Sequence, residues 1–281
     1  MKKVSFLLLA VLMVACTKSP EIKHLTILHT NDTHSQVLPE KRDTIGGYAR
    51  RIGLINKERE TEPNLLLLDA GDFSQGTPYY NYYHGKVEIE AMNWMKYDAA
   101  TLGNHEFDYG LDTLAKYLKM ADFPIVCANY GVTGTPLEGI VKPFEIFERN
   151  GIKVGVFGLG CDPRSVIDDE NFAPIKYLGP EYTVAQQMAD TLRSLGCDVV
   201  VCLSHQGTKP HNEDPSEPEP YDVEMVTQTR GIDIVIGGHT HETIDTLVNN
   251  MDGQPVRLCQ MGKYGGKIGK IMLSVRDKNE K

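Results

Sequence analysis

The chain has 281 residues, of which 41% are hydrophobic and 24% are charged, and these values are typical of a globular protein with one large or two small domains. The 26 glycines and 15 prolines are too few for a low-complexity or fibrous chain. The formal net charge of −9 argues against a protein that binds nucleic-acid polymers, because such proteins are normally basic.

Residues 1–15 have the pattern of a signal peptide. Lys2 and Lys3 precede an apolar run up to Ala15, which is shorter than the roughly 20 residues of a membrane-spanning helix. The small residues before Cys16 resemble a bacterial lipoprotein processing site, which predicts lipid attachment at Cys16 and a tether over residues 16–23. The alternative is an ordinary secretory signal with an incidental cysteine. We expect an exported protein, namely a periplasmic or cell-surface lipoprotein attached to a bacterial membrane.

Short apolar runs alternate with helical patterns along the rest of the chain. Strands are predicted at residues 24–29, 64–69, 99–102, 123–128, 198–203 and 232–236, and helices at 48–57, 87–97, 111–120 and 182–195. The Asn150-Gly151 pair between the runs 144–148 and 153–159 predicts a β-hairpin, and antiparallel strands are expected from residue 243 onward. Residues 75–85 and 206–221 are expected to be loops. This interleaving predicts mixed sheets covered by helices.

Side chains of the kinds that bind metal ions follow five of these strands. They are Asp32 and His34, Asp72, Asn104 and His105, His205, and His239 and His241. In layered α/β folds the carboxyl ends of strands lie along one rim, where ligands bind. We therefore expect side chains from five distant segments to lie close together.

The spacing and the donor types both indicate a metal site. In an extended segment residues i and i+2 point the same way, so Asp32 and His34 can reach one ion, and His239 and His241 can flank a shared centre. Carboxylate, amide and imidazole donors suit Mn, Fe or Zn at a hydrolytic centre, and the chain has no C-x-x-C pair for a thiolate site. Chance or helix capping explains any one motif, but such explanations would have to hold at all five places.

Five blocks carry a resemblance to a known family. The blocks are ILHTNDTHSQ, DAGDFSQGTP, MNWMKYDAATLGNHEFDYG, LSHQG and IVIGGHTHE, and the later QMGKYGGKIGK also fits. They resemble the calcineurin-like metallophosphoesterases and, more narrowly, the N-terminal catalytic domain of bacterial 5′-nucleotidases. The likeness covers Leu25 to about Val275. It implies an α/β fold, a four-layer αββα sandwich of two mixed sheets flanked by helices, over residues 24–281.

The resemblance also implies two divalent metal ions, whether Mn, Zn, Fe, Mg or Ca, and a role for each matching residue. By position, one ion would be held by Asp32, His34 and His241, the other by Asn104, His205 and His239, with Asp72 bridging both. His105 and Asp108 would form the catalytic dyad, and Asn104 and His105 would contact the substrate phosphate. A hydroxide bridging the ions would attack phosphorus, and His105 would assist the leaving oxygen. An ordinary alternative for Asp108 is the N-cap of the helix near Leu111.

The function expected from this resemblance is that of a dinuclear-metal phosphoric-ester hydrolase, a phosphomonoesterase similar to 5′-nucleotidases. Alternatives on the same site are a nucleotide-sugar or cyclic-nucleotide phosphodiesterase and a thiosulfohydrolase. The family normally continues into a second domain that stacks the nucleoside base, whereas this sequence ends at Lys281. Either this chain has lax specificity for the base, or a separate polypeptide supplies that domain. The other expected partners are a nucleotide or other small phosphate ester and the membrane.

Several further residues have less specific roles. Glu106 is expected to support the site rather than bind metal, and Asp69 is expected either to orient a ligand or simply to cap a strand end. The tyrosines of residues 75–85 can stack a base, touch a membrane or partner, or pack, and no site is assigned to them. Lys263 and Lys267 are expected to be solvated surface residues, and the alternative is contact with phosphate.

Overall fold

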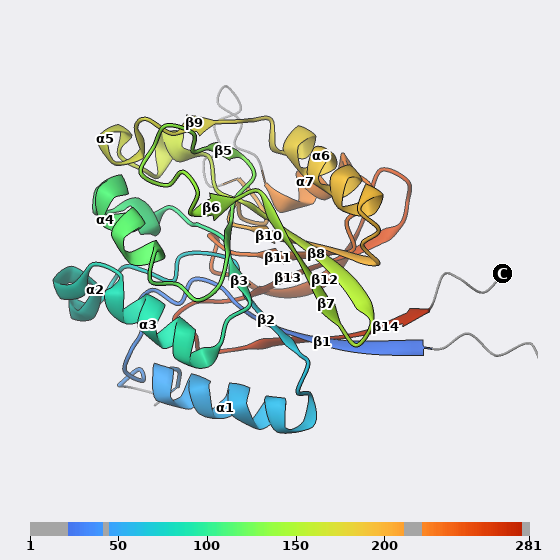
Figure 1. Ribbon diagram of the computed structural model, residues 1–281, viewed down its shortest axis with the longest axis horizontal. Coiled ribbons are helices and arrows are strands. Elements are labelled where there is room, and N and C mark those ends of the chain that lie inside the picture. The colour runs from blue at the N-terminus through green and yellow to red at the C-terminus, as the bar shows by residue number, and fades with distance from the viewer. Residues whose placement is uncertain (1–21, 42–44, 211–220, 277–281) are drawn as a thin grey trace, which may run out of the picture.

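The computed structural model describes residues 22–41, 45–210 and 221–276, so the predicted signal peptide and Cys16 lie outside the described residues. Two six-stranded sheets form the centre of the molecule (Figure 1). The first sheet has the order β14 (Gly269–Arg276), β1 (Ile22–Thr30), β2 (Leu66–Asp69), β3 (Ala99–Ala100), β4 (Ile125–Val126) and β6 (Val141–Lys142). The second has the order β12 (Thr243–Asn249), β13 (Pro255–Met261), β11 (Ile234–Gly237), β10 (Val199–Ser204), β8 (Ile152–Leu159) and β7 (Phe144–Arg149).

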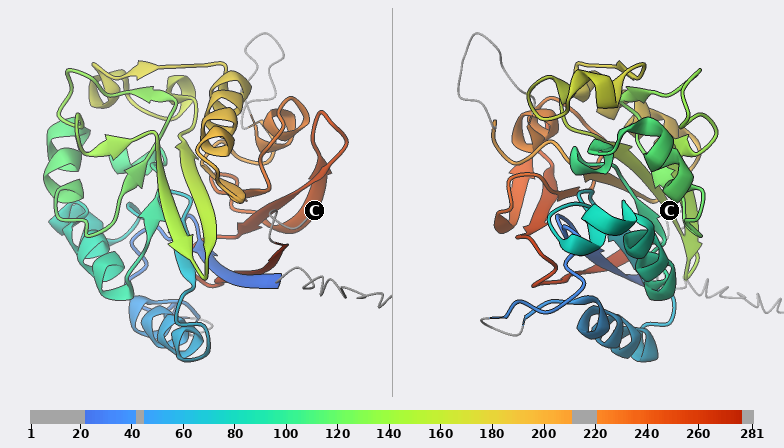
Figure 2. Two further views of the ribbon diagram at one scale, coloured as in Figure 1. Left: turned by 45° about the vertical axis from the view of Figure 1, so that its right-hand side comes forward. Right: turned by 90° about the vertical axis from the view of Figure 1, so that its left-hand side faces the viewer.

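Helices cover the outer face of each sheet (Figure 2). The helices over the first sheet are α1 (Tyr48–Thr61), α3 (Lys86–Met95) and α4 (Gly110–Leu118), with the short α2 (Pro78–Tyr83) beside them. Over the second sheet lie α6 (Glu181–Ser194) and α7 (Asp222–Thr227). The described elements also include a small antiparallel sheet of β5 (Tyr130–Gly131) and β9 (Lys176–Tyr177), the short α5 (Asp169–Phe172) and the 3₁₀ turn Pro163–Ser165.

The strand sequences explain why there are four layers. Because successive side chains of a strand point to opposite faces, the unbroken apolar run of β2 places Leu66 and Leu68 between the sheets and Leu67 under the helices. In β10, Val201 faces the core between the sheets and Cys202 faces α6 and α7. Two strands that are apolar on both faces therefore require cover on both faces, which confirms the predicted αββα sandwich.

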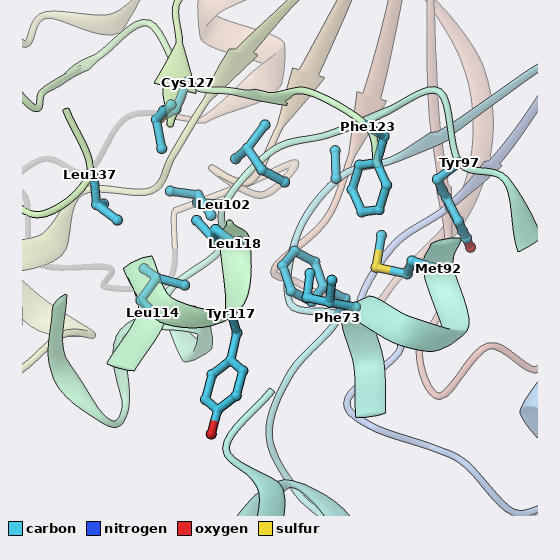
Figure 3. Packing of buried hydrophobic residues seen from close by; sticks show 14 of the residues in the cluster. Phe73, Met92, Tyr97, Leu102, Leu114, Tyr117, Leu118, Phe123, Cys127 and Leu137 are labelled. Carbon is cyan, nitrogen blue, oxygen red and sulfur yellow. The ribbon is translucent and has the colours of Figure 1, made fainter. Parts of the chain in front are cut away.

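The core beneath the helices of the first sheet reaches the loops that follow the strands. Phe73, from the loop after β2, packs there with Met92 of α3, Leu114 of α4 and Phe123 (Figure 3). Phe73 is 2% exposed and directly follows Asp72. The buried ring of Phe73 therefore anchors the loop that carries the predicted ligand Asp72.

One sequence prediction about the elements was wrong in part. Residues 75–85 were expected to be a loop, but they contain α2, which begins with Pro78 at its first turn. The antiparallel strands predicted from residue 243 onward are confirmed. The β12 strand pairs antiparallel with β13, and β14 crosses to the first sheet, where it pairs antiparallel with β1. The predicted hairpin at residues 144–159 is confirmed.

The described part of the predicted loop 206–221 contains no helix or strand, and residues 211–220 lie outside the described residues. Among the helices that the structure describes, none has the length and apolar character needed to cross a membrane.

Candidate metal centre

The loops after β1 and β2 run side by side and are joined by backbone hydrogen bonds. The N–H of Asp32 donates to the carbonyl of Gly71 at 2.9 Å, and the N–H of His34 donates to the carbonyl of Asp72 at 3.0 Å. Parallel pairing of β1 with β2 places the ends of both strands at the same edge of the sheet. Two of the five predicted segments therefore meet through their backbones.

Asp32, His34 and His241 form a first group of potential ligands. One donor atom from each lies within 4.8 Å of the others. The Nε2 atoms of His34 and His241 are 2.9 Å apart, and Asp32 Oδ1 lies 3.5 Å from His241 Nε2. The structure thus brings together the three residues that the resemblance assigned to one ion.

Asp72, His205 and His239 form a second group with the same spacing. His205 Nε2 lies 3.1 Å from Asp72 Oδ2, and the Oδ1 atom of Asn104 lies 3.2 Å from His239 Nδ1. Asp32 Oδ1 is 3.8 Å from His205 Nε2, so the two groups adjoin. All seven predicted ligand residues therefore lie in one cluster.

The reason given for the spacing of Asp32 and His34 was wrong. Neither residue is extended, because their φ angles are 49° and 43°. His239 and His241 also have positive φ, at 74° and 56°, and so does Asp72 at 53°. Non-glycine residues rarely adopt this left-handed conformation, which is concentrated at functional sites. The ligands converge through tight turns rather than along straight strands.

The donor set fits divalent cations. Asp32 is fully buried and Asp72 is 2% exposed, and burying two carboxylates this close together is costly unless positive charge compensates them. The buried His205 Nδ1 lies 2.7 Å from the carbonyl of Ala70, and its Nε2 faces the carboxylate of Asp72 at 3.1 Å. The Nδ1–H group therefore donates to that carbonyl, and Nε2 is left as a ligand atom.

Burial also sets the protonation of the cluster. It raises the pKa of Asp32 and lowers the pKa of His34 to about 4, so His34 is neutral and able to bind a cation at neutral pH. Burial alone would raise the pKa of Asp72 as well, but the neighbouring His205 outweighs it and the pKa is lowered. Asp72 is therefore ionised at neutral pH.

His105 and Asp108 lie beside the two groups. His105 begins the 3₁₀ turn His105–Phe107, and its Nδ1 is 3.2 Å from Asp108 Oδ1. Its backbone N–H donates to Asp72 Oδ1 at 3.0 Å. Burial lowers the pKa of His105, but the hydrogen bond to Asp108 and the charge of Asp72 outweigh it and raise the pKa.

The helix-capping alternative for Asp108 is excluded. The helix begins at Gly110 with Tyr109 at the capping position, and no side chain caps it.

Glu106 supports the site through the backbone, as expected. Its carboxylate accepts hydrogen bonds from the N–H groups of Asp72 at 3.0 Å, Ser74 at 3.0 Å and Gly103 at 2.7 Å. Asp69 accepts hydrogen bonds from Thr30 Oγ1 at 2.5 Å and from the N–H of Gly71 at 2.9 Å. Of its two predicted roles, holding the strand end and the following turn matches these contacts.

Sequence reasoning missed Asn31, which links Asp32 to the end of β13. Its Nδ2 donates to Asp32 Oδ2 at 2.6 Å and to the carbonyl of Gly262 at 2.8 Å, and its Oδ1 accepts from the N–H of Met261 at 2.9 Å. The only signal in the sequence is its position next to Asp32, because Gly262 is more than 200 residues away.

This fold and this donor set define the class of the protein as a metal-dependent hydrolase of the layered α/β type. A sequence profile of the calcineurin-like phosphoesterase family matches residues 25–243. The chain therefore belongs to the calcineurin-like phosphoesterase family, as its motifs indicated.

Individual relatives agree with this family. The chain is 33% identical to snake venom 5′-nucleotidase from Naja atra over 91% of its own length and 51% of that protein. It is similar to the structure of a 5′-nucleotidase precursor from Thermus thermophilus, with a TM-score of 0.78 and 31% identity over 89% of this chain and 51% of that one. The calcineurin-like phosphoesterase YfkN from Bacillus subtilis has a TM-score of 0.76 and 30% identity, over 92% and 87% of the two chains. The chain spans about half the length of the curated relatives it matches.

Proposed function

We propose that this chain is a dinuclear-metal phosphomonoesterase that hydrolyses 5′-nucleotides. The observation that carries the proposal is the pair of adjoining ligand groups, Asp32 with His34 and His241, and Asp72 with His205 and His239. A third imidazole, that of His105, lies within 4.8 Å of donor atoms of His34 and Asp72. The relatives named as 5′-nucleotidases support the choice of nucleotides.

The chain's own residues divide into holders of the ions and groups that act on the substrate. The first group would hold one ion, His205 and His239 with Asn104 the other, and Asp72 lies where it can bridge them. Two bound divalent ions would lower the pKa of water toward neutrality and place positive charge against the phosphoryl oxygens.

His105 is suited to assist departure of the alcohol. Because Nδ1 faces Asp108, Nε2 is the atom left to hydrogen-bond the leaving oxygen, and Asp108 fixes the tautomer and raises the basicity of the ring. The amide of Asn104 can also donate to a phosphoryl oxygen, and such preorganised donors stabilise charge that develops in the transition state.

The test combines metal analysis with a substrate panel on the chain without residues 1–21, which keeps all of β1. We expect two equivalents of divalent metal and hydrolysis of AMP faster than that of a nucleotide sugar, cyclic AMP or thiosulfate. His105→Ala should lower kcat by roughly 10²–10⁴-fold with unchanged metal content, whereas Asp72→Ala should lose both ions. Full activity of His105→Ala, or full metal content in Asp72→Ala, would contradict the assigned roles.

We also propose export and lipid attachment at Cys16, as the N-terminal pattern indicates. The intact protein expressed in a bacterium should fractionate with membranes and carry an acyl modification on Cys16 by mass spectrometry. Cys16→Ser should abolish the modification and leave the soluble activity unchanged. An unmodified Cys16 in the membrane fraction would overturn this assignment.

A further inference from the structure

The loop between β13 and β14, residues 262–268, leads from the second sheet to the first, and we call it the crossing loop (Figure 1). The N–H of Tyr264 donates to the carbonyl of Asp32 at 2.7 Å, and the ring of Tyr264 lies edge-on to that of His34, with 5.8 Å between the centroids. Lys263 Nζ lies over the ring of Tyr264, 4.9 Å from its centroid. The crossing loop therefore carries a cation to the edge of the first ligand group.

The backbone of the crossing loop is tied to the segments that carry the proposed ligands. The carbonyl of Gly262 accepts from Asn31 Nδ2 at 2.8 Å, and its N–H donates to the carbonyl of Glu242 at 2.7 Å. Both partners directly adjoin proposed ligands in the chain. A Cβ added at Gly265 would lie 1.7 Å from Nη2 of the buried Arg51, so the loop packs closely on that guanidinium. The lysine is therefore held by a fixed backbone.

The charge of Lys263 is not compensated by an acidic partner. Lys267 Nζ, in the same loop, donates to Thr243 Oγ1 at 3.1 Å, whereas no carboxylate among the described residues lies within 4.0 Å of Lys263 Nζ. Burial lowers the pKa of His241, and the charge of Lys263 lowers it further, so the ammonium acts on the ligand group. Bound divalent ions would repel this ammonium unless an anion lay between them. The position of Lys263 therefore suits an anion at the metal centre.

We propose that Lys263 binds the reacting phosphoryl group and selects phosphomonoesters over phosphodiesters. Its ammonium donates to a non-bridging oxygen of the ester, and Tyr264 holds the lysine over the site through its ring. A phosphomonoester carries a charge of about −1.5 to −2 at pH 7, whereas a diester has a second esterified oxygen and a single negative charge. The cation therefore favours the monoester. This inference rests on the proposed function and adds a specificity-determining residue outside the metal ligands and the dyad.

The experiment compares p-nitrophenyl phosphate with bis(p-nitrophenyl) phosphate, which release the same leaving group and contain no nucleoside. We expect the ratio of kcat/KM for the monoester to that for the diester to fall about tenfold in Lys263→Ala, since a hydrogen bond between charged groups is typically worth that much. Lys263→Arg should keep most of the ratio, because the charge remains. Lys267→Ala is the matched control, because it removes the same charge from the same loop and should leave the ratio unchanged.

An unchanged ratio in Lys263→Ala overturns the proposal, and so does an equal fall in Lys267→Ala, since the net charge of the surface is then sufficient. Equal losses for both esters overturn it as well, because they indicate a damaged metal centre. Hydrolysis of p-nitrophenyl phosphate without hydrolysis of AMP refutes the proposed nucleotide substrate, and the ratio still tests the role of Lys263.

If the wild-type protein hydrolyses neither p-nitrophenyl ester, calorimetry of the metal-loaded chain with inorganic phosphate replaces the rates. A Kd about tenfold higher in Lys263→Ala than in the wild type and in Lys267→Ala supports the inference. Equal Kd values overturn it.

Discussion

Glu106 offers the sharpest test of how the metal centre is built. Its side chain touches none of the proposed ions, yet one carboxylate joins the loop after β2 to the turn that carries His105. It is 3% exposed and accepts three backbone N–H groups, two at Oε2 and one at Oε1. Substitutions at this position therefore alter the support of the site while every proposed ligand residue keeps its own side chain.

The expected magnitudes follow from counting the N–H groups left unpaired. A glutamine oxygen at the Oε2 position keeps the bonds from Asp72 and Gly103, but its NH₂ group then faces the N–H of Ser74. One buried N–H without a partner costs about 1–3 kcal/mol, so Glu106→Gln should destabilise the fold by that amount. Glu106→Ala leaves three such groups and should cost roughly three times as much, which approaches the total stability of a typical domain.

Urea unfolding of the metal-free protein measures the change in the free energy of unfolding. Competition with a chelating dye measures the metal affinity. We expect Glu106→Gln to weaken metal binding by roughly 10–100-fold, since it displaces Asp72 and the turn before His105. Glu138→Gln is the matched control, because Glu138 accepts one backbone N–H, from Gly134 at 2.9 Å, on an exposed turn. If Glu106→Gln and Glu138→Gln behave alike in both assays, the carboxylate does not organise the site.

Two further predictions concern close packing and burial. A Cβ added at Gly103 would lie 2.1 Å from Asp72 Oδ1 and 2.7 Å from His205 Nε2. We therefore expect Gly103→Ala to lose bound metal and activity together, and a normal metal content by mass spectrometry would contradict this. Burial lowers the pKa of His29 to about 4, below the 6.5 of the unfolded chain, so stability present above pH 6.5 is lost as the pH falls toward 4. Between pH 7.5 and pH 5 this loss should be about 2 kcal/mol in urea unfolding, and His29→Leu should lack this contribution.

The sequence predicted the strands and their ends well because burial on both faces leaves an unmistakable apolar run. The segment of β2 is such a run, because all of its residues are buried. A strand in the centre of a sandwich is covered on both faces and therefore has an apolar sequence. The polar residues that follow these strands were also identifiable. A buried polar side chain such as that of Asp72 or His205 requires a hydrogen bond, an opposite charge or a metal ion, so its position directly after an apolar strand indicates a site. Local sequence carries both signals.

Contacts between distant segments left no such signal. Pairing of β14 with β1 joins the two ends of the described chain, and nothing in either strand distinguishes the other as its partner. The helix α2 was missed because four tyrosines in six residues resemble neither an amphipathic helix nor a strand. The links made by Asn31 to Gly262 and by Glu106 to Ser74 likewise depend on loops that only the folded chain brings together.

Hydrogen bonds between loops hold the proposed ligand residues in a left-handed backbone conformation. Five of the seven proposed ligand residues have positive φ, and each such residue costs on the order of 1–3 kcal/mol relative to ordinary backbone. Hydrogen bonds between the loops hold these turns, including those from Asp32 to Gly71 and from His34 to Asp72. These hydrogen bonds between loops therefore offset part of the strain. Because they join the turns that carry the proposed ligands, we expect substitutions in the supporting residues to weaken metal binding as well.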